Sequence, residues 1–347
     1  MCGPAADFSD YLAARSAFRY PPIAGAAEWP WDGQRVQLQP VDEADVLIVV
    51  DNSVDMLAAG SDRVRRPEPS WDNFERPPMR AEHGLSLLLT VRRDGHESQI
   101  LYDAGVGRDT ALHNMDRLEI RPNQLRAMVL SHGHADHHGG MEGLVARYGR
   151  GLPLVIHPDA WNERKMVLPT GAEVHMPPPS RGDLDAEGVQ LVEERGPTLL
   201  LDDCVLVTGQ VERTTGYEPG FPPQHVRTAD GGWQHDPWVW DDQAMVVNIR
   251  DKGLLVLSGC GHAGMVNILR YARKLTGVDK VHGFVGGMHL TGGLFEKIIA
   301  PTIEELTAMS IGTVVPCHCS GWKAQQQLAL RLPDAYVQSS VGSTVRF

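Results

Sequence analysis

The chain has 347 residues, 42% of them hydrophobic, which is enough for one large α/β domain or two smaller ones. Its formal net charge of −12 argues against nucleic acid as a partner, because an acidic surface repels the phosphate backbone. The odd number of cysteines, the lack of a CxxC pair and the absence of signal-peptide or membrane-span patterns lead us to expect a cytoplasmic protein without a disulfide framework.

Apolar runs and turn residues predict the elements of the N-terminal half. Residues 1–44, rich in Pro and Gly, are interpreted as an extension packed on a single domain that covers 45–347. Strands are expected at 46–50, 84–91, 99–102, 127–130 and 152–156. Helices are expected within 109–118, from Pro122 and over 141–147. Residues 60–80 are interpreted as a loop or lid.

The pattern loosens over 160–240, where Pro, Gly and Trp are frequent, so we expect a second loop or lid insertion there, interrupted by strands at 198–201 and 205–208. The last third is regular. It predicts strands at 245–249, 254–258, 281–285, 312–316 and 335–338, and helices at 263–276, 301–309 and 321–332. Early hairpins followed by strand–helix alternation indicate two mixed sheets between helices.

One segment, Ser131–Gly140, carries an unusual density of metal-ligand side chains. It places four histidines and one aspartate within seven positions, directly after the apolar run 127–130. The carboxyl ends of strands are where open α/β sheets place their ligand sites. Imidazole and carboxylate are ligands of Zn²⁺ and similar ions, and too many are present for one tetrahedral ion with an open position. The segment therefore predicts two metals side by side and hydrolysis by a metal-bound hydroxide.

Three later strands also end in potential ligands. Strand 254–258 is followed by Cys260 and His262, strand 281–285 by His289, and strand 312–316 by His318. Each ending lies next to glycines, which let backbones approach closely. Packing alone does not account for four such endings.

The His-x-His-x-Asp-His signature after a strand resembles the metallo-β-lactamase superfamily. Further motifs are similar to the branch of 7,8-dihydropterin-6-methyl-4-(β-D-ribofuranosyl)aminobenzene-5′-phosphate synthase-like proteins. They include Glu82–Ser86, Leu101–Gly105, Asp241–Ala244, Ser258–Asn267, Gly286–Leu290 and Pro316–Gly321. The resemblance covers residues 45–347. It implies an α/β (α+β) fold, a four-layer αββα sandwich of two mixed sheets flanked by helices, with a two-metal site at one edge of the sheets.

The resemblance also implies a set of metal ligands. His132 and His134 would bind the first metal, Asp136 and His137 the second, and His318 matches the last metal histidine. Many members supply a further histidine where this chain has Gly209-Gln210, so His262 is expected to complete the set. Cys260 stands where a bridging aspartate is usual, and its role as a ligand or as a neighbour of the ligands is left open.

Several residues are candidates for contact with the substrate or for proton transfer. Asp136 would hold the bridging hydroxide, and either His289 or a metal-bound water would protonate the leaving group. His289 could instead take a metal position. The candidates for substrate binding are His83, Arg213, Trp233 and Trp238, for each of which a structural role is the alternative. Cys317 and Cys319 are interpreted as packing residues that point away from His318.

The first functional hypothesis is a dinuclear metal-dependent hydrolase acting on a small or medium ester, lactone, amide or phosphoester. The alternatives are a dihydropterin-type synthase acting on a phosphorylated or pyrophosphorylated substrate, and a non-catalytic ligand-binding relative. Two divalent ions are expected, zinc by default, while iron or manganese suits the same ligands. We expect a small-molecule substrate and neither nucleic acid nor membrane as a partner, and leave a homodimer open.

Overall fold

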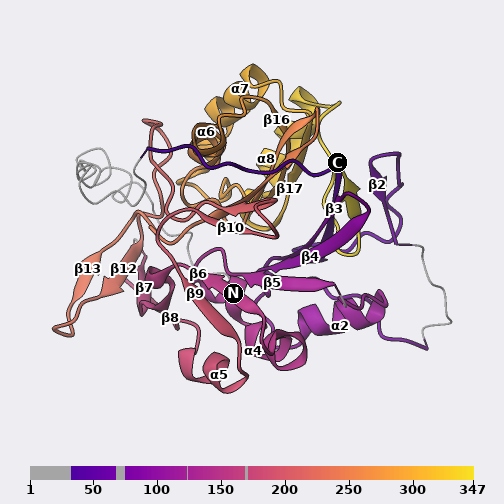
Figure 1. Ribbon diagram of the computed structural model, residues 1–347. Coiled ribbons are helices and arrows are strands. Elements are labelled where there is room, and N and C mark those ends of the chain that lie inside the picture. The colour runs from indigo at the N-terminus through magenta and orange to yellow at the C-terminus, as the bar shows by residue number, and fades with distance from the viewer. Residues whose placement is uncertain (1–32, 68–74, 123, 169–170) are drawn as a thin grey trace.

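The computed structural model describes residues 33–67, 75–122, 124–168 and 171–347, which form two large sheets with helices outside them (Figure 1). The first sheet has the strand order β2-β18-β1-β3-β4-β5-β6-β9. Its strands are β1 (Glu43–Val50), β2 (Val64–Arg65), β3 (Ser86–Arg93), β4 (His96–Tyr102), β5 (Leu125–Val129), β6 (Pro153–Ile156), β9 (Gln190–Glu193) and β18 (Thr344–Arg346). Pairing is antiparallel from β1 to β4 and parallel from β4 to β9, so the sheet is mixed.

The second sheet has the order β10-β11-β14-β15-β16-β17 and is also mixed, with parallel pairing from β15 to β17. Its strands are β10 (Thr198–Leu200), β11 (Val205–Val207), β14 (Ala244–Ile249), β15 (Gly253–Ser258), β16 (Val281–Gly286) and β17 (Thr313–Pro316). Helices α6 (Met265–Thr276), α7 (Ile299–Ala308) and α8 (Trp322–Arg331) cover its outer face, whereas α2 (Thr110–Arg117), α4 (Met141–Leu144) and α5 (Arg181–Ala186) lie on the other side of the molecule (Figure 1).

Alternate residues of the central strands point to opposite faces of their sheet and pack into different hydrophobic cores. In β1, Val46 and Ile48 belong to the core between the sheets, whereas Leu47 and Val49 face the α2 and α4 side. In β15, alternate leucines and valines divide in the same way between the first sheet and the helices α6 to α8. Because both faces of these strands are buried, their sequences are continuous apolar runs. The expected four-layer αββα sandwich is confirmed.

Region 160–240 differs from the expected loop, because it contains a small antiparallel sheet of order β13-β12-β7-β8. These strands are β7 (Arg164–Val167), β8 (Glu173–Met176), β12 (Gln224–Arg227) and β13 (Trp233–His235), and they lie at one side of the sandwich (Figure 1). Each has three or four residues, and β8 and β13 are largely exposed or half-buried. Short strands with little apolar content carry almost no periodic signal, which explains why the sequence pattern did not predict them.

Two smaller predictions are wrong. The last strand is β18 rather than 335–338, where Tyr336 forms only an isolated bridge to Val314 before the chain crosses to pair with β1. No helix begins at Pro122 in the described residues around it, since the Pro122 carbonyl accepts from Leu125 N in a turn that leads into β5.

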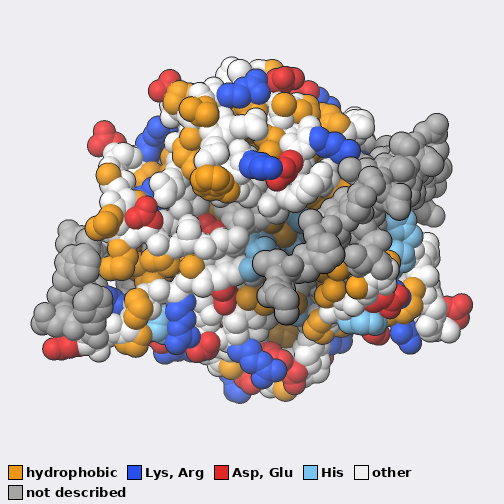
Figure 2. Space-filling model, turned by 180° about the vertical axis from the view of Figure 1, so that it is seen from behind, with side chains coloured by type: hydrophobic (Ala, Val, Ile, Leu, Met, Phe, Trp, Pro, Cys, Tyr) orange, Lys and Arg blue, Asp and Glu red, His pale blue; other side chains and the backbone are white. Residues whose placement is uncertain are grey.

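The predicted N-terminal extension is described only from residue 33 onward. There Val36 N donates to Leu275 O in α6, and Val41 bridges to Ile249 at the end of β14. Within the described parts of the chain, no helix has the length and apolar character needed to cross a membrane. On the face shown in Figure 2, acidic and basic side chains are interspersed, and histidine side chains show near the middle.

Candidate metal centre

Strands from both large sheets end at the same edge of the sandwich. Asp103 follows β4 and His132 follows β5, while Cys260, His289 and His318 follow the parallel strands β15, β16 and β17. Asp103, His289 and His318 have left-handed φ values of 61°, 44° and 47°. This conformation costs a non-glycine residue roughly 1–2 kcal/mol and is found preferentially at functional sites.

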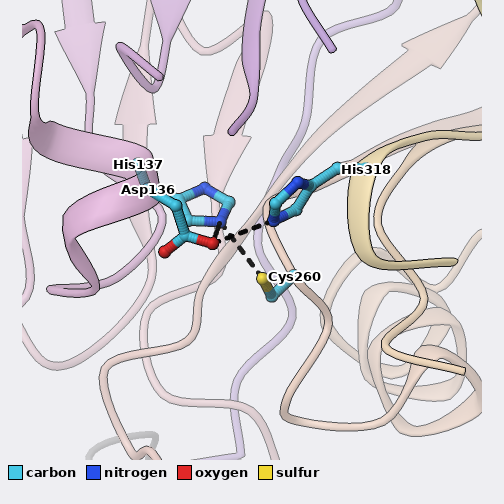
Figure 3. A group of neighbouring side chains, drawn as sticks. All are labelled: Asp136, His137, Cys260 and His318. Atoms are coloured by element: carbon cyan, nitrogen blue, oxygen red, sulfur yellow. Dashed lines mark hydrogen bonds and ion pairs between the residues drawn. The ribbon is translucent and has the colours of Figure 1, made fainter. Parts of the chain in front are cut away.

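The first group of side chains consists of Asp136, His137, Cys260 and His318 (Figure 3). One ligand atom from each lies within 4.8 Å of the others. His137 Nε2 is 3.1 Å from Cys260 Sγ, and His318 Nε2 is 3.0 Å from Asp136 Oδ2. The short helix α3 (Ala135–His138) supplies the first two residues, and the ends of β15 and β17 supply the others. Side chains distant in the sequence thus converge on one point.

A second group contains His132, His262 and the same Cys260, again with ligand atoms within 4.8 Å of one another. His134 joins it through His262, whose Nε2 lies 3.1 Å from His134 Nδ1. His132 Nε2 is buried and has no hydrogen-bond partner in the described part of the chain, an arrangement that costs free energy unless an ion binds there. Imidazole, thiolate and carboxylate are zinc ligands. The two groups therefore fit a pair of metal ions, with Cys260 common to both groups.

Three further side chains orient the histidines. Asp103 Oδ2 lies 2.6 Å from His137 Nδ1, and the same carboxylate accepts from the backbone and hydroxyl of Ser131. Gln224 Oε1 lies 2.6 Å from His134 Nε2. Asn52 Oδ1 lies 3.2 Å from His318 Nδ1. Such contacts fix the ring and tautomer of a metal-binding histidine.

The sequence reasoning assigned no role to any of these three residues. Asp103 could have been noticed as a carboxylate directly after an apolar strand, since the other strand ends were identified by that signal. Asn52 carries the same signal, because it lies two residues after the apolar strand β1, whereas Gln224 lies in an irregular stretch and has no comparable signal.

A buried ion pair fixes the loop that carries the first two histidines. Asp241 Oδ2 accepts from Gly133 N, and its Oδ1 accepts from the buried Arg164 guanidinium, each at 2.7 Å. Burial raises the pKa of Asp241, but Arg164, His157, His134 and the hydrogen bond from Gly133 N together outweigh burial and lower it. In contrast, burial raises the pKa of the neighbouring Asp242 to about 7. Asp242 Oδ2 accepts from Ala263 N, which follows His262.

Burial and neighbouring charges set the protonation of the cluster. Burial lowers the pKa of His137, but the Asp103 and Asp136 carboxylates outweigh it and raise this pKa to about 9. Burial raises the pKa of Asp136, yet His137 and His318 outweigh it and hold this pKa well below its usual range. Burial, assisted by Arg164, lowers the pKa of His134 to about 4. Asp136 is therefore anionic and His134 neutral near pH 7, which are the forms that bind metal ions.

The substrate candidate His83 and the proton-donor candidate His289 both lie beside the cluster. His83 is exposed, its Nε2 is 3.8 Å from Asp136 Oδ2, and its ring centroid is 4.7 Å from that of His318. The ring of His289 lies 4.3 Å from that of His262 and also contacts the ring of Phe221. His83 therefore lies on the side of the cluster that faces solvent, and His289 lies on the side that packs against Phe221.

Arg213 does not occupy the position expected of an anion-binding residue. It is buried, and its guanidinium donates to the carbonyls of His262 at 2.8 Å and Trp238 at 2.6 Å. Burial lowers its pKa to about 10, so the side chain stays charged and holds the loop that carries His262.

The two tryptophans also make structural contacts. Trp233 lies in the small sheet under Lys165 and Arg227, with cation-to-ring distances of 4.6 and 5.2 Å. Trp238 is half-buried and packs against Trp240. The role of these two side chains in substrate binding stays a prediction.

Comparisons with known proteins agree with this arrangement. The sequence model of the metallo-beta-lactamase superfamily matches residues 81–273. The chain is 27% identical over 276 residues to the 7,8-dihydropterin-6-methyl-4-(beta-D-ribofuranosyl)-aminobenzene-5′-phosphate synthase of Methanocaldococcus jannaschii, a match that covers 78% of this chain and 92% of that protein. An uncharacterised protein of the same organism is 26% identical over 261 residues, covering 74% and 91% of the two chains.

Among solved structures, the fold is similar to that of Tm1679, described as a metal-dependent hydrolase of the beta-lactamase superfamily. The TM-score is 0.65 at 21% identity, and the match covers 88% of this chain and 98% of the other. The fold, the strand-end ligands and the sequence match agree, and the chain belongs to the metallo-β-lactamase superfamily.

Proposed function

We propose that the protein is a dinuclear metal-dependent hydrolase of a small or medium ester, lactone, amide or phosphoester. The observation that carries the proposal is the pair of ligand groups that share Cys260. Asp136, His137 and His318 would hold one ion, and His132, His134 and His262 the other. Two bound divalent ions acidify a water molecule and polarise the scissile oxygen of the substrate.

The protein's own side chains complete the proposed site. The Asp136 carboxylate, kept anionic by His137 and His318, would orient the attacking water. His83 lies at the exposed side, where the substrate would enter. His289, beside His262, is placed to supply a proton to the leaving group.

The test combines metal analysis with a substrate panel. Purified protein should contain close to two metal equivalents, and fewer than one would rule out the dinuclear centre. His132→Ala should lose metal and lower turnover on the order of 100-fold or more. His138→Ala is the matched control, because His138 follows the same motif but its Nε2 contacts the Pro177 carbonyl instead. Nitrophenyl esters, lactones and phosphodiesters would separate acyl from phosphoryl chemistry.

A synthase acting on a phosphorylated or pyrophosphorylated substrate is the second candidate. It is supported by the 27% identity to the dihydropterin-type synthase over most of both chains. Release of phosphate or pyrophosphate from such substrates, without turnover of esters or lactones, would favour it. Full metal loading with no turnover in either group would favour a ligand-binding relative.

A further inference from the structure

A third group of potential metal ligands lies beside the two described above. Cys260, Cys319 and His289 offer two sulfur atoms and one imidazole nitrogen, all within 4.8 Å of one another. Both cysteines are buried, with exposures of 2% and 3%. The sequence prediction that Cys319 is only a packing residue is therefore incomplete, because the turn after His318 brings Cys319 to the cluster.

The backbone is arranged so that the two cysteines can meet. Cys319 Sγ donates to the Cys260 carbonyl at 3.2 Å. A Cβ on Gly287 would lie 2.7 Å from Cys319 Sγ and 3.0 Å from Cys260 Cα. Glycine at position 287 thus provides the space for this contact. The chain then brings in His289 through its left-handed backbone conformation.

The side chain of His289 lacks a polar partner at one nitrogen. Its Nδ1 is buried and has no hydrogen-bond partner within the described residues. The ring packs edge-on against Phe295 at 4.4 Å and Phe221 at 5.3 Å, so apolar contacts fix its orientation. A buried imidazole nitrogen without a partner costs free energy unless a ligand binds it.

We propose that Cys260, Cys319 and His289 form a third binding site, for a thiophilic metal ion such as Zn²⁺, Cd²⁺ or Cu⁺. Two thiolates and one imidazole are a softer donor set than the histidine and carboxylate ligands around it, and soft donors select such ions. Three protein ligands leave a fourth position open to an exogenous ligand. The site shares Cys260 with the proposed hydrolase centre, but it does not require hydrolase activity.

Cadmium binding to the reduced full-length protein tests the proposal. Equilibrium dialysis gives the number of bound ions, and the ultraviolet charge-transfer absorbance reports cadmium–thiolate bonds. Cys319→Ala and His289→Ala should each bind one Cd²⁺ fewer than the wild type, and Cys319→Ala should also lower the absorbance. Cys317→Ala is the matched control, since Cys317 is buried in the same segment but its Sγ donates to the Val315 carbonyl.

Equal cadmium binding and equal absorbance in Cys319→Ala and wild type would overturn the proposal. If either alanine variant fails to fold, Cys319→Ser and His289→Asn give the same comparison with smaller changes of shape. The outcome is separable from that of the hydrolase proposal, because His132→Ala should retain the Cys319-dependent ion even where it loses another.

Discussion

At the scale of single residues, three side chains outside the candidate ligand groups orient the histidines of the site. His137, His134 and His318 each direct one ring nitrogen toward the cluster while the other contacts a fixed oxygen of Asp103, Gln224 or Asn52. These contacts determine which nitrogen is free to bind an ion. Of these three contacts, the Asp103 contact is the one that involves a carboxylate, and it also raises the pKa of His137 against the effect of burial.

We therefore expect Asp103→Asn to weaken the affinity for the ion held by His137 about 10–100-fold. The reason is that the amide no longer provides a charged acceptor for His137 Nδ1. Competition against a chelating dye measures this affinity. The control is Asp94→Asn, the same change at another aspartate of left-handed φ, in the turn between β3 and β4. Equal affinities in Asp103→Asn and wild type would contradict the orienting role.

At the scale of elements, the small sheet β13-β12-β7-β8 of the inserted region contacts the candidate metal centre. Its strand β12 begins with Gln224, which contacts His134, and its strand β7 begins with Arg164, which pairs with Asp241 beside Gly133. The sheet therefore holds the His132–His134 loop from outside the sandwich.

Gln224→Leu should lower the affinity for the ion held by His132, His134 and His262 by about 10–100-fold, because His134 Nε2 loses its acceptor. The control is Gln234→Leu on the neighbouring strand β13, where the side chain is exposed. Titration of the metal-free variants with Zn²⁺ gives the comparison. If Gln224→Leu binds the ion of this group with the same affinity as the wild type, β12 does not position His134.

The start of α6 gives a prediction about pH. Glu218 accepts hydrogen bonds from Val266 N and Asn267 N, yet burial raises its pKa despite them. A group whose pKa is higher in the folded state contributes stability below its unfolded pKa and loses it as pH rises through the folded value. Relative to Glu218→Gln, the unfolding free energy of the wild type should therefore fall between about pH 4 and about pH 7. Denaturant titrations at both pH values measure the difference, and a rise would contradict the argument.

At the scale of the whole molecule, the candidate metal centre is formed by residues that follow strands of both large sheets. His132 and His137 follow a strand of the first sheet, whereas Cys260, His262 and His318 follow strands of the second. An ion bound by both groups would therefore connect halves of the sandwich that are otherwise held by the apolar core between them.

Removing metal with a chelator should lower the unfolding temperature, and adding Zn²⁺ should restore it. Free ion at 100 times its dissociation constant stabilises the folded state by about 2.7 kcal/mol per site. A thermal scan with and without chelator measures the shift, and His132→Ala should show a smaller one than His138→Ala. Identical unfolding temperatures in the two conditions would contradict a metal link between the sheets.

The order of residues along the chain was enough to predict the main strands and most of the candidate ligands. Strands buried on both faces are continuous apolar runs, as in 254–258, and their positions are visible without any knowledge of pairing. Ligands placed directly after such runs, His132 and His318 among them, must lie at strand ends. Local order along the chain is sufficient to place these strands and the residues that follow them. The resemblance to the superfamily, which implied the αββα sandwich, is confirmed.

Which side chains contact the candidate ligands became visible only once the chain was folded. Asp103 and His137 are 34 residues apart, and Gln224 and His134 are 90 apart, so sheet pairing and chain crossings bring them together. The same long-range packing turned Arg213 toward backbone carbonyls and placed Cys319 beside Cys260. A sequence pattern records which residues can be buried, whereas the partner of each buried polar group is set by the pairing of distant segments.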